Sequence, residues 1–526
     1  MSIKSSIYEK KRAQNMKEYD YDFVIVGSGF GGSVSALRLS EKGYKVLVIE
    51  KGKRLTADDF PKTNWNLKKW MWIPVLRFFG FFKLSFFRHI TILSGVGVGG
   101  GSLVYANTLA IPKKEFYESG SWKKLVDWEN ELKPYYRKAL EMLGAVENPR
   151  LETGDLALKK LGKLIGKENE FYPTTVAVSF GNGEKSNLNE CNFCGGCMTG
   201  CRYNAKNTLD KNYLAEAEKL GAEIISETEV IDVVPLDGNK GESGYRVLTK
   251  SSTSFFKSKK SFITKSIVFS GGVLGTVKLL LKLKQTSLPN LPGQVGADVR
   301  TNSESLVGVT TFDKSISFSD GIAIGSILYT GNSTHLEPVR YGSGSGFWRI
   351  LMSPMVSGKS VWSRIKNIIL DLIKYPIKNF KVFTVWNWAK RTQILLFMQT
   401  IDSKIRFTLS RFGMKTEMQE GKAPSAFIPE AKELAEKYAG IVNGKPMVLL
   451  TETLGGIPTT AHILGGAVIG ANRSEGVIDS NQKVFGYENM WVCDGSAISA
   501  NPGVNPSLTI LAMTERAMDK VPGKAD

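Results

Sequence analysis

Histidine and long apolar runs are scarce in this chain of 526 residues. Only three histidines occur, so few side chains can exchange a proton near neutral pH. No uninterrupted apolar run reaches the roughly 20 residues of a membrane-spanning helix, and the first 20 residues lack the apolar core of a signal peptide. The sequence therefore predicts neither a transmembrane helix nor a signal peptide, and it predicts a cytoplasmic protein.

Acidic side chains are also in the minority, with 50 Asp and Glu against 69 Lys and Arg, a net charge of +19. Such a charge suits a nucleic acid or an anionic membrane surface. No nucleic-acid-binding module is recognisable, so no nucleic-acid partner is predicted. Two segments that mix aromatic and basic residues, 60–92 and 361–391, are typical of peripheral contact with an anionic membrane. The alternative for residues 60–92 is a helical insertion that packs on the rest of the protein.

Cysteine is infrequent as well, yet four of the five cysteines lie within eleven residues: Cys191, Cys194, Cys197 and Cys201. Their spacing matches a ferredoxin-type run, although Arg202 stands where the usual proline would follow. An iron–sulfur cluster is one prediction. A zinc site, and thiols or a disulfide without metal, are the alternatives.

A dinucleotide-binding pattern begins near the N-terminus. An apolar strand, Tyr21 to Val26, leads into Gly27, Gly29 and Gly32 of a G-x-G-x-x-G loop, and a second apolar strand ends at Glu50. Glycines let the backbone approach a pyrophosphate at a helix N-terminus, and the acid can hold ribose hydroxyls. Glu50 argues against a 2′-phosphate but does not separate NAD from FAD.

The rest of the chain predicts two kinds of structure. A second glycine loop, 95–102, could lie flat against a planar ligand because no Cβ intervenes. Strands near Val230 and before Ser270 look like later strands of the same parallel sheet. Residues 305–445 show no alternation of strand and helix, which favours an antiparallel sheet with helices that covers a substrate. The predicted fold is α/β, with a discontinuous Rossmann-like domain.

Two sites near the C-terminus carry candidate chemistry. His462 precedes a Gly-Gly pair that gives a ligand close access, and a neutral imidazole can accept a hydroxyl proton. Asn505 and Pro506 precede a helical pattern whose N-terminus would stabilise an anion. The alternative for Asn505 is a plain N-cap.

Eight blocks in order resemble the glucose-methanol-choline (GMC) oxidoreductases and, within that family, the actinobacterial type of cholesterol oxidase. They are GSGFGG, GVGVGGGSLVYANTL, CMTGCRYNAKNTLDKNYL, GGVLGT, VGADVRTNSES, HLEPVR, HILGGA and GVNPSLTI. The resemblance implies non-covalent FAD and oxidation of an apolar alcohol such as a 3β-hydroxysteroid by hydride transfer to flavin N5. Electrons would pass to O2 or to an external carrier.

The resemblance also implies roles for individual residues. His462 and Asn505 would serve oxidation, and Glu337 would act as the base in a Δ5 to Δ4 isomerisation. Tyr105 stands where related oxidases place an asparagine. The implied cofactor-binding residues are Gly27, Gly29, Phe30, Gly31, Gly32, Glu50, Gly99, Gly100, Ser102, Asn107, Val230, Asp494, Gly495, Asn505 and Pro506.

Some GMC dehydrogenases carry an iron–sulfur cluster near the equivalent of Cys191–Cys201, so a dehydrogenase of another alcohol or sugar is an alternative. A non-catalytic flavin and cysteine electron carrier is a further one. In the domain prediction, residues 1–125, 205–304 and 446–526 form the FAD-binding domain. Residues 126–204 form a cysteine-containing insertion or cap, and residues 305–445 bind the substrate.

Overall fold

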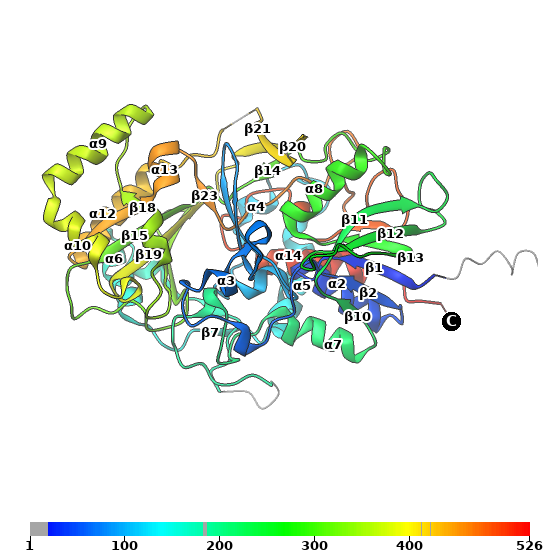
Figure 1. The fold of residues 1–526 in the computed structure, drawn as a ribbon, viewed down its shortest axis with the longest axis horizontal. Coiled ribbons are helices and arrows are strands. Elements are labelled where there is room, and N and C mark those ends of the chain that lie inside the picture. Colours follow the sequence, from blue (N-terminus) through cyan, green and yellow to red (C-terminus); the bar gives the residue numbers. More distant parts are fainter. Residues whose placement is uncertain (1–18, 182–186, 412, 421, 526) are drawn as a thin grey trace, which may run out of the picture.

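Two seven-stranded sheets organise the molecule and lie in different halves of it (Figure 1). The computed structural model describes residues 19–525 apart from 182–186, 412 and 421. The prediction that the N-terminus is no signal peptide therefore falls almost wholly outside the described residues.

The first sheet has a parallel core built from distant parts of the chain. Its parallel strands, in spatial order, are β10 (Glu223–Ile225), β2 (Val46–Ile49), β1 (Tyr21–Val26), β13 (Lys259–Phe269) and β24 (Met490–Val492). The strands β11 (Thr228–Pro235) and β12 (Tyr245–Ser251) extend it in the antiparallel sense. The prediction of a parallel strand that ends at Val230 is confirmed for β10, which pairs with β2. It is wrong for β11, which holds Val230, because β11 to β13 follow one another through loops too short for a parallel crossover.

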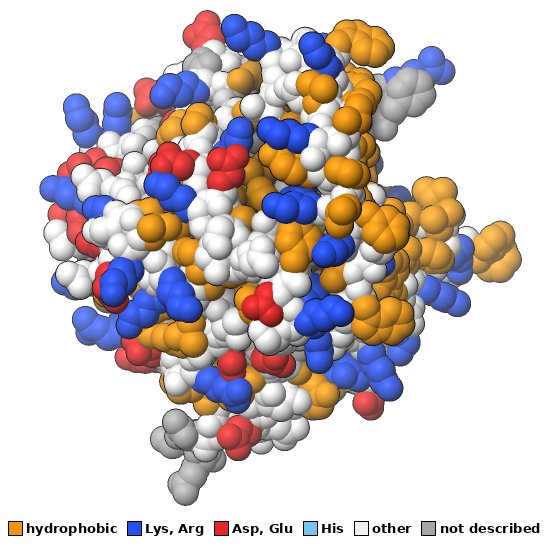
Figure 2. All heavy atoms as spheres, turned by 90° about the vertical axis from the view of Figure 1, so that its left-hand side faces the viewer, with side chains coloured by type: hydrophobic (Ala, Val, Ile, Leu, Met, Phe, Trp, Pro, Cys, Tyr) orange, Lys and Arg blue, Asp and Glu red, His pale blue; other side chains and the backbone are white. Residues whose placement is uncertain are grey.

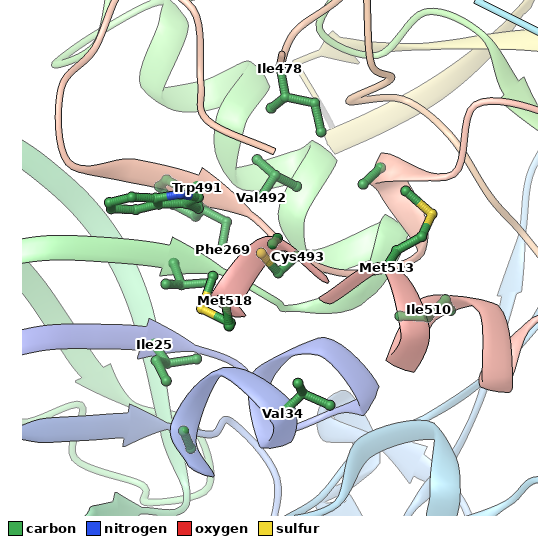
Figure 3. Packing of buried hydrophobic residues seen from close by; sticks show 14 of the residues in the cluster. Ile25, Val34, Phe269, Ile478, Trp491, Val492, Cys493, Ile510, Met513 and Met518 are labelled. Carbon is green, nitrogen blue, oxygen red and sulfur yellow. The ribbon is translucent and has the colours of Figure 1, made fainter. Parts of the chain in front are cut away.

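Helices cover this sheet and complete its core. The helices that do so include α2 (Phe30–Glu41), α5 (Trp128–Met142), α7 (Tyr213–Lys219) and α14 (Ser507–Asp519). Figure 3 shows the packing, with Ile25 of β1, Val34 of α2, Phe269 of β13 and Met513 of α14 in one cluster. Each such side chain contributes about 1.5–3 kcal/mol when it is fully buried. The last helix of the chain is thereby fixed against the first strand.

The second sheet is antiparallel throughout, which confirms the predicted second architecture. Its strands, in spatial order, are β18 (Met352–Pro354), β22 (Gly444–Leu449), β15 (Ser305–Thr311), β19 (Thr392–Gln399), β17 (Thr334–Val339), β16 (Ser326–Tyr329) and β8 (Phe171–Pro173). Helices α6 (Thr153–Leu164) and α12 (Pro429–Ile441) pack on it through a common apolar cluster. Strand β8 lies in the predicted cap, and β22 crosses the predicted boundary at residue 446. The division into domains stays a prediction.

The aromatic segment 60–92 forms short strands and loops rather than a helical insertion. It holds one short helix, α3 (Leu67–Trp70), and the strands β3 (Trp72–Ile73), β4 (Phe78–Phe79), β5 (Phe82–Phe86) and β6 (Thr91–Gly95). Trp70 and Phe82 stack with ring centroids 4.7 Å apart and are both buried. The expectation of a helical insertion is wrong because aromatic side chains suit a pleated, half-buried surface.

The second aromatic and basic segment is helical. It forms α9 (Val361–Lys374), α10 (Pro376–Thr384) and α11 (Trp388–Arg391), and α9 and α10 stand at one end of the molecule (Figure 1). In the part of the chain that the structure describes, none of the helices has both the length and the hydropathy needed to cross a membrane.

Candidate active site

A cavity of about 880 Å³ takes its lining from both sheets. One part is lined by the glycine loop after β1, by Glu50, by Val230 and by the loop before α8 (Gly272–Lys284). Another part is lined by apolar side chains of the antiparallel sheet, among them Val339 and Leu396. His462, Asp494 and Asn505 line the same continuous cavity. A long ligand could therefore touch both halves of the molecule.

The first glycine loop brings bare backbone to the cavity. Gly27 has φ +101°, and a Cβ there would lie 2.4 Å from the carbonyl oxygen of Ser270. At Gly29, the residue before α2, a Cβ would meet nothing nearer than 3.9 Å, so the loop is open on the cavity side. The backbone N–H groups at the start of α2 can thus receive an anion such as a pyrophosphate.

Glu50 lies directly after β2 and lines the cavity while it braces the glycine loop. Its carboxylate accepts hydrogen bonds from the N–H (3.2 Å) and hydroxyl (2.8 Å) of Ser28 and from the N–H of Gly52 (2.8 Å). A carboxylate has about four acceptor positions, so one remains for a ribose hydroxyl. The ribose contact of Glu50 stays a prediction.

The second glycine loop touches the first. Gly100 has φ +55°, and a Cβ there would lie 2.6 Å from the Cα of Gly29. Gly100 lines the cavity, as do the predicted residues Phe30 and Gly31. Four other predicted cofactor-binding residues are not among the described residues that line it: Gly32, Gly99, Ser102 and Asn107.

These four residues are placed to shape the loops. A Cβ on Gly32 would lie 2.0 Å from the carbonyl oxygen of Gly27, so only glycine lets α2 come so close. Ser102 donates to the carbonyl of Gly99 (2.7 Å) and accepts from the N–H of Leu209 (3.1 Å). Asn107 is buried with φ +71°, and its side-chain amide has no partner among the described residues.

His462 is held by an acid that the sequence did not single out. Its Nδ1 lies 3.1 Å from Oε2 of Glu304, which is fully buried. The other oxygen of Glu304 accepts from the N–H of Ala461 (3.1 Å) and the hydroxyl of Thr460. Burial alone would lower the pKa of His462, but the charge and hydrogen bond of Glu304 outweigh it and raise that pKa above its usual value. No described residue is bonded to Nε2, which leaves that nitrogen for a ligand in the cavity.

Asn505 and Glu337 meet beside the same cavity. Pro506, not Asn505, is the N-cap residue of α14, so the plain N-cap alternative for Asn505 is not what the structure shows. The Asn505 amide instead donates to Oε2 of Glu337 at 3.4 Å, and its carbonyl oxygen has no partner among the described residues. Glu337 is fully buried on β17, and Nε2 of His335 lies 3.5 Å from its other oxygen. The negative charge of Glu337 also helps to raise the pKa of His462.

Asp494 and Gly495 line the cavity beside the start of α8. The carboxyl group of Asp494 accepts from the hydroxyl of Thr276 (2.5 Å) and the N–H of Ser496 (2.8 Å). Burial raises the pKa of Asp494, and these hydrogen bonds oppose that effect.

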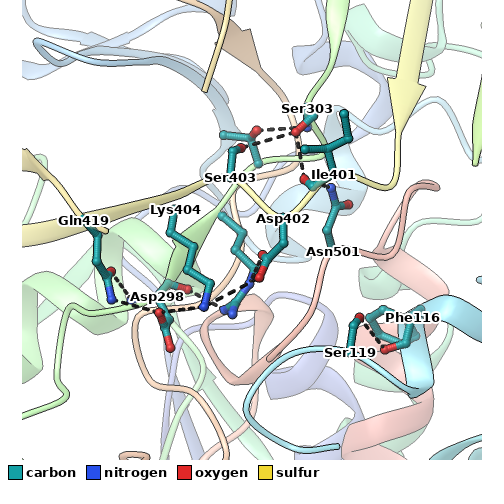
Figure 4. Close-up of polar contacts among 12 residues, drawn as sticks. Phe116, Ser119, Asp298, Ser303, Ile401, Asp402, Ser403, Lys404, Gln419 and Asn501 are labelled. Atoms are coloured by element: carbon teal, nitrogen blue, oxygen red, sulfur yellow. Dashed lines mark hydrogen bonds and ion pairs between the residues drawn. The ribbon is translucent and has the colours of Figure 1, made fainter. Parts of the chain in front are cut away.

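Polar contacts around residues 298–304 fix the segment that carries Glu304 (Figure 4). The Ser303 hydroxyl donates to the carbonyl of Ile401 (2.9 Å), and the Asn501 amide donates to that same carbonyl (2.7 Å). The side chain of Asp298 accepts from Gln419 at 2.9 Å and lies 3.4 Å from Nζ of Lys404. The loop before Asn505 and the segment before Glu304 are therefore both tied to the loop at Ile401, between β19 and β20 (Lys404–Ser410).

The four clustered cysteines do not form a metal centre in this structure. All of them are free thiols, and the described residues include no group of three or more His, Cys, Asp or Glu side chains that could hold a metal ion. Burial raises the pKa of Cys197 to about 11. The structure thus gives no support to the iron–sulfur and zinc predictions.

A buried lysine joins the cysteine segment to the cavity wall, and no motif in the sequence indicated this role. Nζ of Lys206 donates to the carbonyls of Leu103 (3.1 Å), Tyr105 (2.8 Å) and Cys197 (2.9 Å). Burial lowers the pKa of Lys206 to about 7. The hydroxyl of Tyr105 donates to the carbonyl of Asn207 (3.0 Å), so this cavity-lining residue is anchored at both ends.

Known proteins resemble the chain over nearly its whole length. Family models described as GMC oxidoreductase match residues 21–283 and 432–514. A cholesterol oxidase from Acinetobacter baumannii is 45% identical over 532 residues, which cover 97% of this chain and 96% of that protein. A cholesterol oxidase from Mycobacterium tuberculosis (strain ATCC 25618 / H37Rv) is 38% identical, over 96% and 92%.

Solved structures agree on the fold. Pyridoxine 4-oxidase from Mesorbium loti matches with a TM-score of 0.62 and 14% identity, over 95% of this chain and 99% of that one. A fungal aryl-alcohol oxidase matches with a TM-score of 0.58 and 14% identity, over 95% and 98%. At this level of identity the likeness establishes the architecture alone.

The residues present fit FAD, the cofactor of this family. The backbone at Gly29 leaves room for a pyrophosphate, and Glu50 retains acceptor capacity for a ribose. At the N-terminus of α14, the buried hydroxyl of Ser507 has no hydrogen-bond partner among the described residues, so it can bond to a polar group of a ligand. The chain therefore belongs to the GMC oxidoreductase family and is an FAD-dependent enzyme that oxidises a CH–OH group.

Proposed function

We propose that the alcohol is a 3β-hydroxysteroid such as cholesterol. The observation that carries this proposal is the apolar part of the cavity, which leads to His462 and Asn505. Its walls include Phe82, Val339, Trp348, Met352, Ile394 and Leu396. Such walls suit a rigid hydrocarbon that carries one hydroxyl, because a sugar would leave most of its hydroxyls without partners. Two relatives at 38% identity or more carry the name cholesterol oxidase.

His462 is the proposed acceptor of the hydroxyl proton. Glu304 holds Nδ1, which fixes the ring and directs Nε2 to the ligand. Bound FAD supplies the acceptor for the hydride. Asn505, at the N-terminus of α14, donates to the substrate oxygen or the ring beside it, where the positive end of the helix favours developing negative charge. We assign the contacts with the FAD nucleotide to those predicted cofactor-binding residues that line the cavity.

Glu337 is the proposed base for the shift of the Δ5 double bond to Δ4. A carboxylate can remove a proton from the carbon between the new carbonyl and the double bond and return it further along. Its position supports this role, because it is enclosed, bonded to Asn505 and close enough to His462 to affect the pKa of that side chain. His335 lies on its other side, within 3.5 Å.

Dioxygen is the proposed electron acceptor, in keeping with the oxidase names of the relatives. Incubation of the FAD-loaded enzyme with cholesterol in air, with oxygen uptake and steroid products measured together, tests both parts. We expect one O2 consumed per steroid and the Δ4-3-ketone as product. Glu337→Gln should release the Δ5-3-ketone at a nearly normal rate of oxygen uptake. A wild-type enzyme that consumes no oxygen with any sterol but oxidises another alcohol would refute the proposed substrate.

A further inference from the structure

Helices α9 and α10 expose most of their apolar side chains, and Val382 of α10 is the buried exception. Of the 14 residues of α9, all of which the structure describes, only Arg364 is buried. Trp362 is 80% exposed and Ile373 71% exposed. On α10 and just after it, Ile377 and Phe380 are each 69% exposed and Trp386 is 92% exposed. Figure 2 looks onto this end of the molecule, where hydrophobic side chains gather together with Lys and Arg along one edge.

Apart from the buried Val382 of α10, polar side chains fix this helical hairpin to the body. The guanidinium of Arg364 donates to the carbonyls of Leu454 (2.8 Å) and Gly358 (3.2 Å). Nζ of Lys445, on β22, lies 2.6 Å from the carboxylate of Asp371. A helix on the surface of a globular protein normally buries its apolar stripe and exposes its charges. The reversed arrangement here holds the apolar stripe in a fixed position outside.

The charges left outside are of one sign. Lys366, Lys374, Lys378 and Lys381 are exposed on the hairpin. Its one acid, Asp371, already accepts from Lys445 and from the amide of Asn379 at 3.0 Å. Aromatic side chains, aliphatic side chains and lysines without free acids are the composition of a segment that lies in the interface of an anionic bilayer. Two copies of the chain would bring rows of lysines together, which disfavours self-association here.

The hairpin is close to the apolar part of the cavity. Helix α9 contacts β18 and α13 (Leu450–Gly455). Met352, the first residue of β18, and Leu449, the residue before α13, both line the cavity. Between a bilayer at the hairpin and the cavity, a lipid-like alcohol would therefore have to pass only the layer formed by β18 and α13.

We propose that α9 and α10, with Trp386, form the surface through which the enzyme docks on an anionic lipid bilayer. At 14 residues α9 is about 21 Å long, shorter than a bilayer core of about 30 Å, so the helices lie along the interface. Delivery of an apolar substrate through this docking surface rests on the proposed function. Binding of the docking surface to lipid can be tested separately, because it needs no turnover.

Cosedimentation of the FAD-loaded enzyme with sterol-free vesicles tests the docking surface. We expect binding to vesicles that contain phosphatidylglycerol, weaker binding to pure phosphatidylcholine, and release at high salt. The double variant Ile373→Glu, Phe380→Glu should bind at least about tenfold more weakly. Leu220→Glu also replaces an exposed apolar side chain with a carboxylate, but it lies just after α7 and away from the hairpin. This variant should bind like the wild type.

Circular dichroism and oxidation of a detergent-dispersed substrate provide the control, and the double variant should match the wild type in both. Equal vesicle binding by wild type and double variant would overturn the proposal. So would a wild type that ignores anionic vesicles but forms a dimer that the double variant cannot form, because a second copy would then cover the hairpin. Failure to oxidise any sterol, with vesicle binding intact, would refute only the proposed function.

Discussion

Helices α14 and α9 have 13 and 14 residues, yet the protein uses them in opposite ways. Every residue of α14 from Ser507 to Met518 is buried, and its N-terminus reaches the cavity beside Asn505. In α9 only Arg364 is buried, and the apolar side chains face outward. The apolar content of a helix therefore does not by itself determine whether protein or another surface covers that helix. Helix α14 belongs to the core and the site, whereas we propose that α9 belongs to a lipid surface.

The largest expected effect separates the two helices by stability. Leu511→Asp places a carboxylate in the fully buried face of α14, and we expect a loss of at least about 4 kcal/mol in the free energy of unfolding. Ile373→Asp makes a comparable change on exposed α9 and should cost no more than about 0.5 kcal/mol. Urea unfolding followed by circular dichroism measures both. Similar losses in the two variants would show that the outer face of α9 is packed after all.

The second prediction separates the inner site from the outer hairpin by activity. His462→Ala should lower turnover at least about a hundredfold, because no other described group takes the place of the imidazole. The flavin absorbance should be unchanged, since the predicted FAD contacts are elsewhere. Ile373→Glu, assayed on the same detergent-dispersed substrate, should turn over normally. If His462→Ala lost its FAD, the residue would hold the cofactor rather than the proton.

The third prediction concerns the pH dependence that Glu304 gives to the inner site. His462 must be neutral to accept a proton, so kcat/KM should fall as pH decreases through its pKa. Glu304 raises that pKa. Glu304→Gln should therefore move the acidic limb of the profile to lower pH and reduce the maximum on the order of tenfold. A lower maximum with an unmoved limb would mean that Glu304 only supports the chain around Thr460.

The fourth prediction concerns α13, the short helix that α9 contacts, and is read only from the pH dependence of stability. Burial raises the pKa of Glu452 to about 8. A raised pKa in the folded state means that the stability contributed by the protonated form is full below the ordinary value of 4.5 and is lost as pH rises through about 8. Glu452→Gln, which cannot ionise, should show a flatter dependence of Tm on pH across this range. Parallel Tm curves for both proteins would contradict the assignment.

The cofactor end of the fold could be predicted because its rules are local. The order of strand, glycine loop, helix, strand and acid from Tyr21 to Glu50 is fixed by steric needs at adjacent positions. The antiparallel sheet could be predicted because residues 305–445 lack the alternation of strand and helix that is typical of a parallel sheet. The strands in residues 60–92 were missed because their aromatic side chains pack against residues distant in the sequence, such as Trp348.

The chemistry of the site was only partly readable. His462 and Asn505 stood in recognisable blocks, but the acid that orients His462 lies 158 positions earlier in the chain. Glu304 occurs within VRTNSES, one of the resembling blocks, and that block was the one available signal. The iron–sulfur prediction rested on spacing alone, and spacing along the chain does not show whether the sulfur atoms of the four cysteines converge; among the described residues they do not form a metal-holding group.

A crystal structure of the FAD-loaded enzyme with a steroid product tests most directly whether the two ends of the chain meet at one reactive centre. We expect the steroid oxygen about 3 Å from Nε2 of His462 and from the Asn505 amide, with the flavin ring beside it. A flavin ring outside the part of the cavity that these two residues line would contradict it, as would a steroid oxygen bonded to neither.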